Sequence, residues 1–105
     1  MSINDEILKI KDAIVSAVEV EKLYLFGSYA YGTPHENSDY DFYMVIPNGS
    51  MRPIDAMHEA RWAIRKMNVR DVDLLANTKD RFAYRSQGLT IEKTVADKGV
   101  LLYEC

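Results

Sequence analysis

The densest chemical pattern in the chain is GSYAYGTPHENSDYD, residues 27–41. The apolar run of residues 23–26 leads into it, and the aromatic and β-branched run of residues 39–46 leads out of it. Each run has the length and composition of a buried strand. Gly27 allows a sharp turn after the first strand, and residues 29–31 predict a short helical turn. The pattern therefore predicts a strand, a turn, a short helix, a loop and a second strand, in that order.

Apolar residues recur at helical spacing on both sides of this region. In a helix expected over residues 3–18 the stripe consists of Ile3, Ile7, Ile10, Ile14 and Val18. In a helix expected over residues 53–67 it consists of Ile54, Met57, Ala60, Ile64 and Met67. The other expected elements are a strand over residues 69–76, a helix over residues 89–97, and an edge strand or packed tail over residues 100–103. Residues 77–87 are polar and show no clean period.

This alternation of helices and strands predicts an α/β (α+β) fold, with a small mixed sheet of three to four strands flanked by helices. The length of 105 residues fits one domain over residues 1–105. Ser2, followed by an acidic residue three positions later, is a candidate cap of the first helix.

Charge and composition narrow the class of protein. Thirteen basic and sixteen acidic residues give a formal net charge of -3, which disfavours binding to long nucleic acid. The polar, acidic beginning of the chain is unlike a signal peptide, and no apolar run has the length of a membrane helix. The single cysteine, Cys105, cannot form an internal disulfide or a cysteine-rich zinc site. We therefore expect a cytoplasmic protein that is not bound to a membrane.

Two acidic residues begin the second predicted strand. Asp39 and Asp41 point to the same face, because side chains two residues apart in a strand share a face. Their like charges repel unless a cation lies between them, and hard oxygen ligands suit Mg²⁺ or Mn²⁺. The competing interpretation is a solvated acidic strand end.

A third carboxylate, Asp73, lies inside the apolar third strand, where a charge is costly unless it is paired or binds metal. If this strand lies beside the second, Asp73 completes a three-carboxylate cluster of the kind that holds two metal ions for phosphoryl transfer. The alternative is an edge-strand aspartate paired with Arg70 or Arg65. Gly27 and Ser28 similarly form either an anion site at the start of a short helix or a plain turn.

Together these parts resemble the GS-x10-DxD signature of the polymerase-beta-like nucleotidyltransferase superfamily. The matching positions are Gly27, Ser28, Ala30, Gly32, Ser38, Asp39 and Asp41. The resemblance covers nearly the whole chain and is strongest to the minimal nucleotidyltransferases, which are small prokaryotic proteins. It implies the nucleotidyltransferase fold.

The resemblance also implies roles for the motif residues. Gly27, Ser28 and Ser38 would bind the nucleotide, and Asp39, Asp41 and Asp73 would be catalytic and bind two Mg²⁺ ions, with Mn²⁺ as a substitute. The reaction would move a nucleoside monophosphate, AMP from ATP, to a hydroxyl and release pyrophosphate. Minimal nucleotidyltransferases are often paired with a HEPN-domain toxin, and known members act as antitoxins that adenylylate a tyrosine of that partner.

Two departures from the family pattern leave alternatives open. Tyr29 and Tyr31 stand where the pattern often has arginine, so a bidentate phosphate ligand is missing. The chain also lacks the extra helical domain of larger members, so a partner or a second copy would complete the site. One alternative is a non-catalytic antitoxin that acts by direct binding. The other is a nucleotidyltransferase for a small molecule such as an aminoglycoside.

Some remaining polar and aromatic residues have two interpretations each. Trp62 lies off the apolar stripe of its helix, so it either marks a partner surface or packs partly against the tail. Basic residues gather in the middle of the chain, where they serve triphosphate or partner binding or form a solvated helix face: Arg61, Arg65, Lys66, Arg70, Arg81 and Arg85. We interpret His35 as a solvated loop residue.

Overall fold

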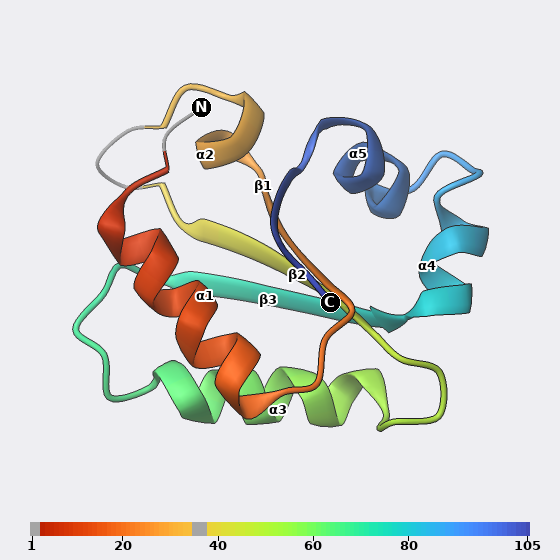
Figure 1. Ribbon diagram of the computed structural model, residues 1–105. Coiled ribbons are helices and arrows are strands. Elements are labelled where there is room, and N and C mark those ends of the chain that lie inside the picture. The colour runs from red at the N-terminus through yellow and green to blue at the C-terminus, as the bar shows by residue number, and fades with distance from the viewer. Residues whose placement is uncertain (1–2, 35–37) are drawn as a thin grey trace.

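A computed structural model describes residues 3–34 and 38–105 (Figure 1). Ser2 and His35, which carried two of the predictions above, lie outside the described residues. The elements in chain order are α1 (Asp5–Ala17), β1 (Lys22–Phe26), α2 (Ser28–Tyr31), β2 (Tyr40–Ile46), α3 (Pro53–Ile64), β3 (Val72–Thr78), α4 (Lys79–Arg85), α5 (Ile91–Lys98) and β4 (Val100–Glu104).

The four strands form one mixed sheet in the order β3-β2-β1-β4. β1 pairs antiparallel with both β2 and β4, whereas β2 and β3 are parallel. A parallel pair needs a crossover connection, and α3 supplies it. The predicted small mixed sheet flanked by helices is therefore confirmed, and residues 100–104 form an edge strand rather than a packed tail.

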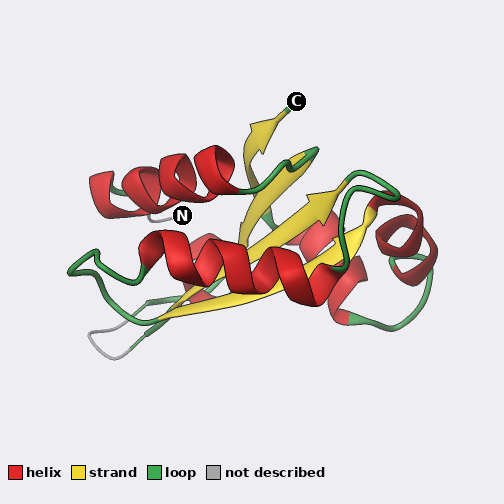
Figure 2. Ribbon diagram, turned by 90° about the horizontal axis from the view of Figure 1, so that it is seen from below, coloured by secondary structure: helices red, strands yellow, loops and turns green. Residues whose placement is uncertain are grey.

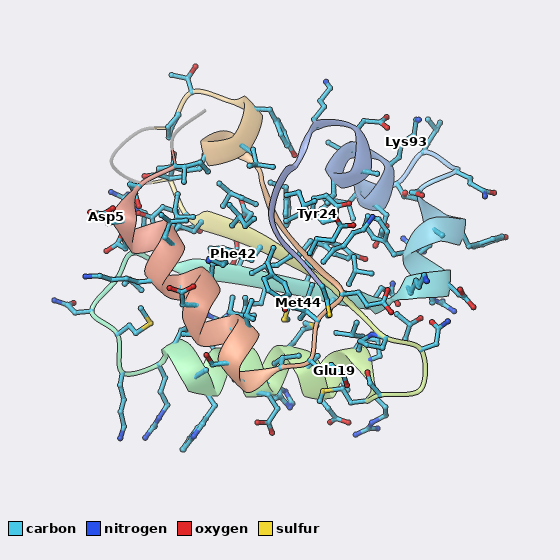
Figure 3. The ribbon with its side chains drawn as sticks, viewed as in Figure 1. Asp5, Glu19, Tyr24, Phe42, Met44 and Lys93 are labelled. Carbon is cyan, nitrogen blue, oxygen red and sulfur yellow. The ribbon has the colours of Figure 1, made fainter. Side chains whose placement is uncertain are left out.

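One face of the sheet is covered by α1 and α3, which lie side by side in Figure 2. Phe42 and Met44 of β2 point into this layer with the buried residues of both helices (Figure 3). Those helix residues are Ile7, Ile10, Ile14, Ala56, Ala60 and Ile64. The stripe predicted for α1 is confirmed at its centre.

The stripe predicted for α3 is wrong at its first position. Ile54 is 45% exposed, because the buried face of α3 is set by Ala56, Ala60 and Ile64. Small alanines let this helix approach the sheet closely, and the face opposite them carries Ile54 and Trp62 to the solvent. Spacing alone did not decide between Ile54 and Ala56, since Ile54 lies three residues before Met57 and Ala56 lies four before Ala60. Both spacings suit one face of a helix.

The opposite face of the sheet is covered only in part, by α4 and α5. Phe82 of α4 and Val95 of α5 pack on Phe26, Tyr43 and Val45. Sequence periodicity missed α4, because this seven-residue helix buries a single side chain and so has no stripe. The uncovered part of this face is where the acidic residues lie.

Element boundaries differ from the predicted ones at functionally relevant points. α1 begins at Asp5, and the side chain of Asn4 caps it by accepting a hydrogen bond from the Ile7 N–H at 2.8 Å. β2 begins at Tyr40, so Asp39 precedes the strand instead of opening it. Among residues 3–34 and 38–105, no helix has the length and apolar character needed to cross a membrane.

Candidate active site

Two carboxylates meet across the parallel strand pair, near the N-terminal ends of both strands. Asp41 of β2 and Asp73 of β3 are register partners. Both side chains point to the same face, because parallel neighbours in register share the pleat. The structure thus places Asp73 beside Asp41. Arg65, one partner in the alternative pairing, has its guanidinium over Trp62 instead, 3.8 Å from the ring centroid.

The pKa of Asp41 is affected by Asp73, its neighbour across the strands. Burial, the charge of Asp73 and a hydrogen bond with Asp73 raise the pKa of Asp41 to about 6, and the charge of Asp39 adds a smaller effect. A raised carboxyl pKa marks a place where negative charge is poorly accommodated. The pair is therefore a site at which a proton or a cation is favourable.

Gly27 lies directly against this carboxyl group. Its φ is 76°, a backbone conformation that residues with a side chain rarely adopt. A Cβ at this position would lie 2.0 Å from Oδ2 of Asp41. Two features therefore require glycine at this position: the backbone conformation of the turn into α2, and the carboxylate that packs against its backbone.

The short helix α2 is held in place by aromatic packing. The ring of Tyr29 is buried edge-on against Tyr40, with centroids 4.7 Å apart. The guanidinium of Arg70 lies 5.8 Å and 5.9 Å from these two ring centroids and donates a hydrogen bond to the carbonyl oxygen of Ser38 at 3.1 Å. Arg70 thus joins α2, the loop before β2 and the start of β3. Tyr31, in contrast, is 43% exposed.

A cavity of about 320 Å³ opens beside the two aspartates. Its lining residues are Phe26, Asp41, Arg61, Asp73, Leu74, Leu75 and Ile91. Arg61 comes from α3 on the other face of the sheet and reaches round the edge strand β3, where its Nη1 donates to the carbonyl oxygen of Val72 at 2.7 Å. The site therefore combines two carboxyl groups, a guanidinium and an apolar wall.

Comparison with known protein families agrees with this geometry. Residues 7–101 match the model of the nucleotidyltransferase domain. The chain belongs to the nucleotidyltransferase domain family. The family resemblance predicted from residues 27–41 is thereby confirmed, whereas the narrower prediction of a HEPN-associated antitoxin stays a prediction. No curated protein matches the sequence.

Two solved structures resemble this nucleotidyltransferase domain. One is a toxin–antitoxin structure with AMP-PNP, which is 22% identical, has a TM-score of 0.59 and is matched over 97% of this chain and 75% of that chain. The other is described as a nucleotidyltransferase from Sulfolobus solfataricus, and is 23% identical with a TM-score of 0.62 over 91% of this chain and 75% of that chain. At these identities the likeness shows a shared fold.

The donor set of this nucleotidyltransferase domain fits a divalent cation in part. Asp41 and Asp73 supply hard oxygen ligands, and burial and the charge of Asp73 raise the pKa of Asp41. In the part of the chain that the structure describes, no group of three or more His, Cys, Asp or Glu side chains is arranged to hold a metal ion. Asp39, just outside β2, influences Asp41 only weakly. Metal binding by all three aspartates therefore stays a prediction.

A buried ionic network fixes α5 beside the cavity of the nucleotidyltransferase domain. Tyr43 donates a hydrogen bond to Glu92 Oε2 at 2.7 Å, and Arg85 Nε donates to Glu92 Oε1 at 3.0 Å. Burial alone would raise the pKa of Glu92, but the bonds from Tyr43 and Arg85 outweigh it, and the pKa is lowered. Burial and the bond to Glu92 raise the pKa of Tyr43. The network holds Ile91, the neighbour of Glu92, at the cavity wall.

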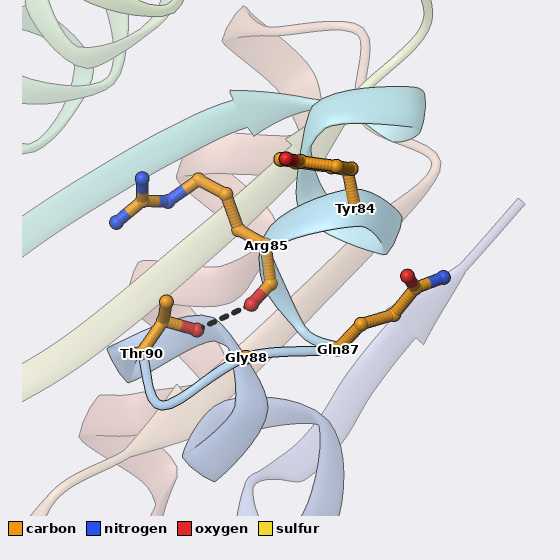
Figure 4. Close-up of a pocket in the computed structure, with 5 residues that line it drawn as sticks. All are labelled: Tyr84, Arg85, Gln87, Gly88 and Thr90. Carbon is orange, nitrogen blue, oxygen red and sulfur yellow. Dashed lines mark hydrogen bonds between the residues drawn. The ribbon is translucent and has the colours of Figure 1, made fainter.

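A separate hollow of about 310 Å³ lies at the turn between α4 and α5, lined by Tyr84, Arg85, Gln87, Gly88 and Thr90 (Figure 4). Polar groups that line this hollow form hydrogen bonds within the turn. The Thr90 hydroxyl donates to the Arg85 carbonyl at 2.6 Å and accepts from the Lys93 N–H at 3.2 Å, which caps α5. This hollow is part of the helical link and carries none of the predicted site residues.

Sequence reasoning pointed to Gly27, Asp41 and Asp73, which the structure brings together. It left Arg61 open between triphosphate or partner binding and a solvated helix face, and it assigned no site role to the residues of α5. Arg61 lies on a helix of the opposite layer, and only the edge position of β3 brings it to the site. Ile91 and the Glu92 network belong to α5. The resemblance of residues 91–103 to the tail of the minimal nucleotidyltransferases gave these residues no site role. A glutamate near the start of a predicted helix, with an arginine upstream, was the one available signal for the network.

Proposed function

We propose that the protein transfers a nucleoside monophosphate, AMP from ATP, to a hydroxyl group, and that the acceptor is a tyrosine of a partner HEPN-domain protein. The observation that carries the proposal is the register pairing of Asp41 with Asp73 beside Gly27. The family match supports nucleotide transfer in general. The structural likeness to a toxin–antitoxin structure with AMP-PNP supports ATP as donor and a protein as partner.

In this proposal the chain's own residues position both substrates. Gly27, Ser28 and Ser38 bind the triphosphate, as the family resemblance implies, and Gly27 lies against the Asp41 carboxylate, which brings the triphosphate site next to the aspartates. The acceptor hydroxyl enters through the cavity between Asp73 and Ile91. The bond from the α-phosphorus to the acceptor oxygen forms, the bond to the bridging oxygen breaks, pyrophosphate leaves and the hydroxyl proton passes to a base, for which Asp73 is placed.

Asp39, Asp41 and Asp73 would hold two Mg²⁺ ions, with Mn²⁺ as a substitute, and bound Mg²⁺ would neutralise charge on the phosphates. Tyr29 has no cationic group to replace the missing arginine, and its ring is buried against Tyr40. Arg61 is the guanidinium that lines the cavity. We therefore assign phosphate or acceptor contacts on that side to Arg61.

Intact mass spectrometry tests the proposal. The HEPN-domain partner is incubated with this protein, Mg²⁺ and each nucleoside triphosphate in turn. We expect a mass gain of one or more AMP units with ATP, and none with the Asp39→Asn/Asp41→Asn double variant. A gain of equal size with the folded double variant contradicts the proposal.

A second candidate is an antitoxin that acts by contact without catalysis. The specific observation in its favour is the absence of a cation at positions 29 and 31, where Tyr29 is packed inward and Tyr31 faces solvent. It predicts that the Asp39→Asn/Asp41→Asn variant still protects cells from the partner. Loss of protection by a variant that remains folded and bound excludes this candidate.

A further inference from the structure

The outer face of α3 carries an exposed aromatic side chain in a basic surrounding. Trp62 is 66% exposed, although burial of a tryptophan is strongly favourable. It faces away from Ala56, Ala60 and Ile64, which form the buried side of the helix. The indole is therefore not packed in the hydrophobic core.

Arg65 fixes the orientation of the indole. Its guanidinium stacks on the ring at 3.8 Å from the centroid, a cation–π contact that restricts both side chains. An exposed aromatic ring that is held in one orientation loses little entropy when a partner covers it. Tryptophan and arginine are also the residues enriched at the energetic centres of interfaces.

The surface around Trp62 is positively charged, whereas the chain as a whole has a negative net charge. Arg61, Arg65 and Lys66 are exposed around Trp62, and among the residues with described positions no ion pair involves these three. Glu59, one turn back on α3, offsets one of the three charges. The chain as a whole has a net charge of -3, so the positive character is local and suits an acidic partner.

This surface is continuous with the candidate active site. Arg61 follows α3 on its outer side and also lines the cavity that contains Asp41 and Asp73. α3 and the cavity lie on opposite faces of the sheet, and β3 is the edge strand, so the route between them passes round β3 alone. Arg61 follows this route, and a segment of a partner seated on Trp62 and Arg65 would follow it past Arg61 to reach the two aspartates.

We propose that residues 61, 62, 65 and 66, here called the α3 surface, dock an acidic protein surface and present its acceptor hydroxyl to the cavity. The inference rests on the proposed function and names the chemistry of its acceptor. A protein is favoured over a nucleic acid because three basic residues make a small electrostatic footprint, whereas a nucleic-acid site is usually built from a larger basic face.

The test uses labelled poly(Glu,Tyr), an acidic polypeptide that carries tyrosine hydroxyls. Poly(Lys,Tyr) is the control polypeptide of opposite charge, and poly(U) is the control nucleic acid. We expect anisotropy to show binding of poly(Glu,Tyr) alone, weakened about tenfold or more by Trp62→Ala or Arg65→Glu. The matched control is Arg81→Glu, which makes the same charge change on α4 and should alter affinity less than about twofold. Trp62 is the only tryptophan, so its emission should shift on binding.

The outcomes separate this inference from the proposed function. Equal affinity in Trp62→Ala, Arg65→Glu and the control, or tighter binding of poly(U), overturns the α3 surface as an acidic-protein site. AMP transfer to the HEPN-domain partner at an unchanged rate in folded Trp62→Ala and Arg65→Glu also overturns it. Binding that depends on both residues, with no nucleotide transfer to any acceptor, supports the surface and contradicts only the proposed function.

Discussion

Oδ2 of Asp41 occupies the space that a Cβ of residue 27 would fill, with only 2.0 Å between the two positions. The first glycine of the GS motif and the second aspartate of the DxD motif are therefore in direct contact. The two halves of the motif are one packing unit, in which the backbone of Gly27, between β1 and α2, fits against a side chain of β2. This contact explains why neither half is informative without the other.

Substitution of Gly27 by alanine should disrupt this contact. We expect Gly27→Ala to lower the free energy of unfolding by roughly 2 to 4 kcal/mol, because the new Cβ meets Asp41 in a backbone conformation with φ of 76°. The measurement is a urea titration followed by circular dichroism. Nucleotide transfer should be lost as well.

Gly49→Ala is the matched control for this variant. Gly49 has a φ of 78°, but no atom lies within 4 Å of the place that a Cβ would take there. It should therefore show the conformational cost alone, about 1 kcal/mol. Equal destabilisation by the two variants would show that the Asp41 contact is unimportant.

Neutralising Asp41 should make stability less dependent on pH. The folded-state pKa of about 6 lies above the ordinary aspartate value, so the wild-type protein is favoured by protonation below pH 4 and loses that contribution as the pH rises through 6. We compare the free energy of unfolding of Asp41→Asn with that of the wild type at each pH. The difference should favour the variant by about 1 kcal/mol more at pH 7.5 than at pH 4, after allowance for partial solvation. Urea titrations at both pH values measure this, and a pH-independent difference contradicts it.

Divalent cations should relieve the same repulsion. We expect Mg²⁺ to raise the melting temperature of the wild-type protein at pH 7.5, because a ligand that binds only the folded state stabilises it. Asp41→Asn and Asp73→Asn should abolish the rise, and Asp39→Asn should reduce it. Glu59→Gln, an exposed change on α3, is the control that should leave the rise intact. A rise that survives loss of both Asp41 and Asp73 places the cation elsewhere.

The buried network around Glu92 should contribute to stability and to the cavity wall. Tyr43→Phe removes a 2.7 Å hydrogen bond to a carboxylate that is 5% exposed, and should cost about 1 to 3 kcal/mol. Because the pKa of Glu92 is lowered, its contribution is present above its ordinary value and is lost as the pH falls through the folded-state pKa. Glu92→Gln should therefore destabilise the protein more at pH 7 than at pH 3.

A double-mutant cycle of Tyr43→Phe and Glu92→Gln separates the bond from the two individual losses. We expect coupling between the two substitutions in urea titrations, together with a raised KM for the acceptor because Ile91 loses its fixed position. Additive effects on stability would mean that the two groups act independently.

The sequence was sufficient for features that depend on local spacing. The strand before Gly27, the turn of residues 28–31 and the isoleucine stripe of α1 all follow from neighbours in the chain. The pairing of Asp41 with Asp73 was predicted only on the condition that the second and third strands are adjacent. That condition is a property of topology, and the parallel register of β2 and β3 meets it.

The parts that were missed depend on tertiary contacts. Ile54 is exposed because two alanines, rather than the larger residues, face the sheet on α3. Arg61 joins the cavity because β3 happens to be an edge. Neither fact has a local signal, since periodicity records which positions are apolar and not which of two apolar faces is chosen.

The crossover through α3 makes the protein's reactivity a property of complete folding. In an unfolded or half-folded chain Asp41 and Asp73 are two separate side chains, and they become neighbours only when β3 docks on β2. Partly folded molecules should therefore be inert rather than slow or unselective. The total activity in a cell would be proportional to the number of correctly folded molecules. Mild destabilisation anywhere in the sheet would reduce that number without changing the activity of each folded molecule.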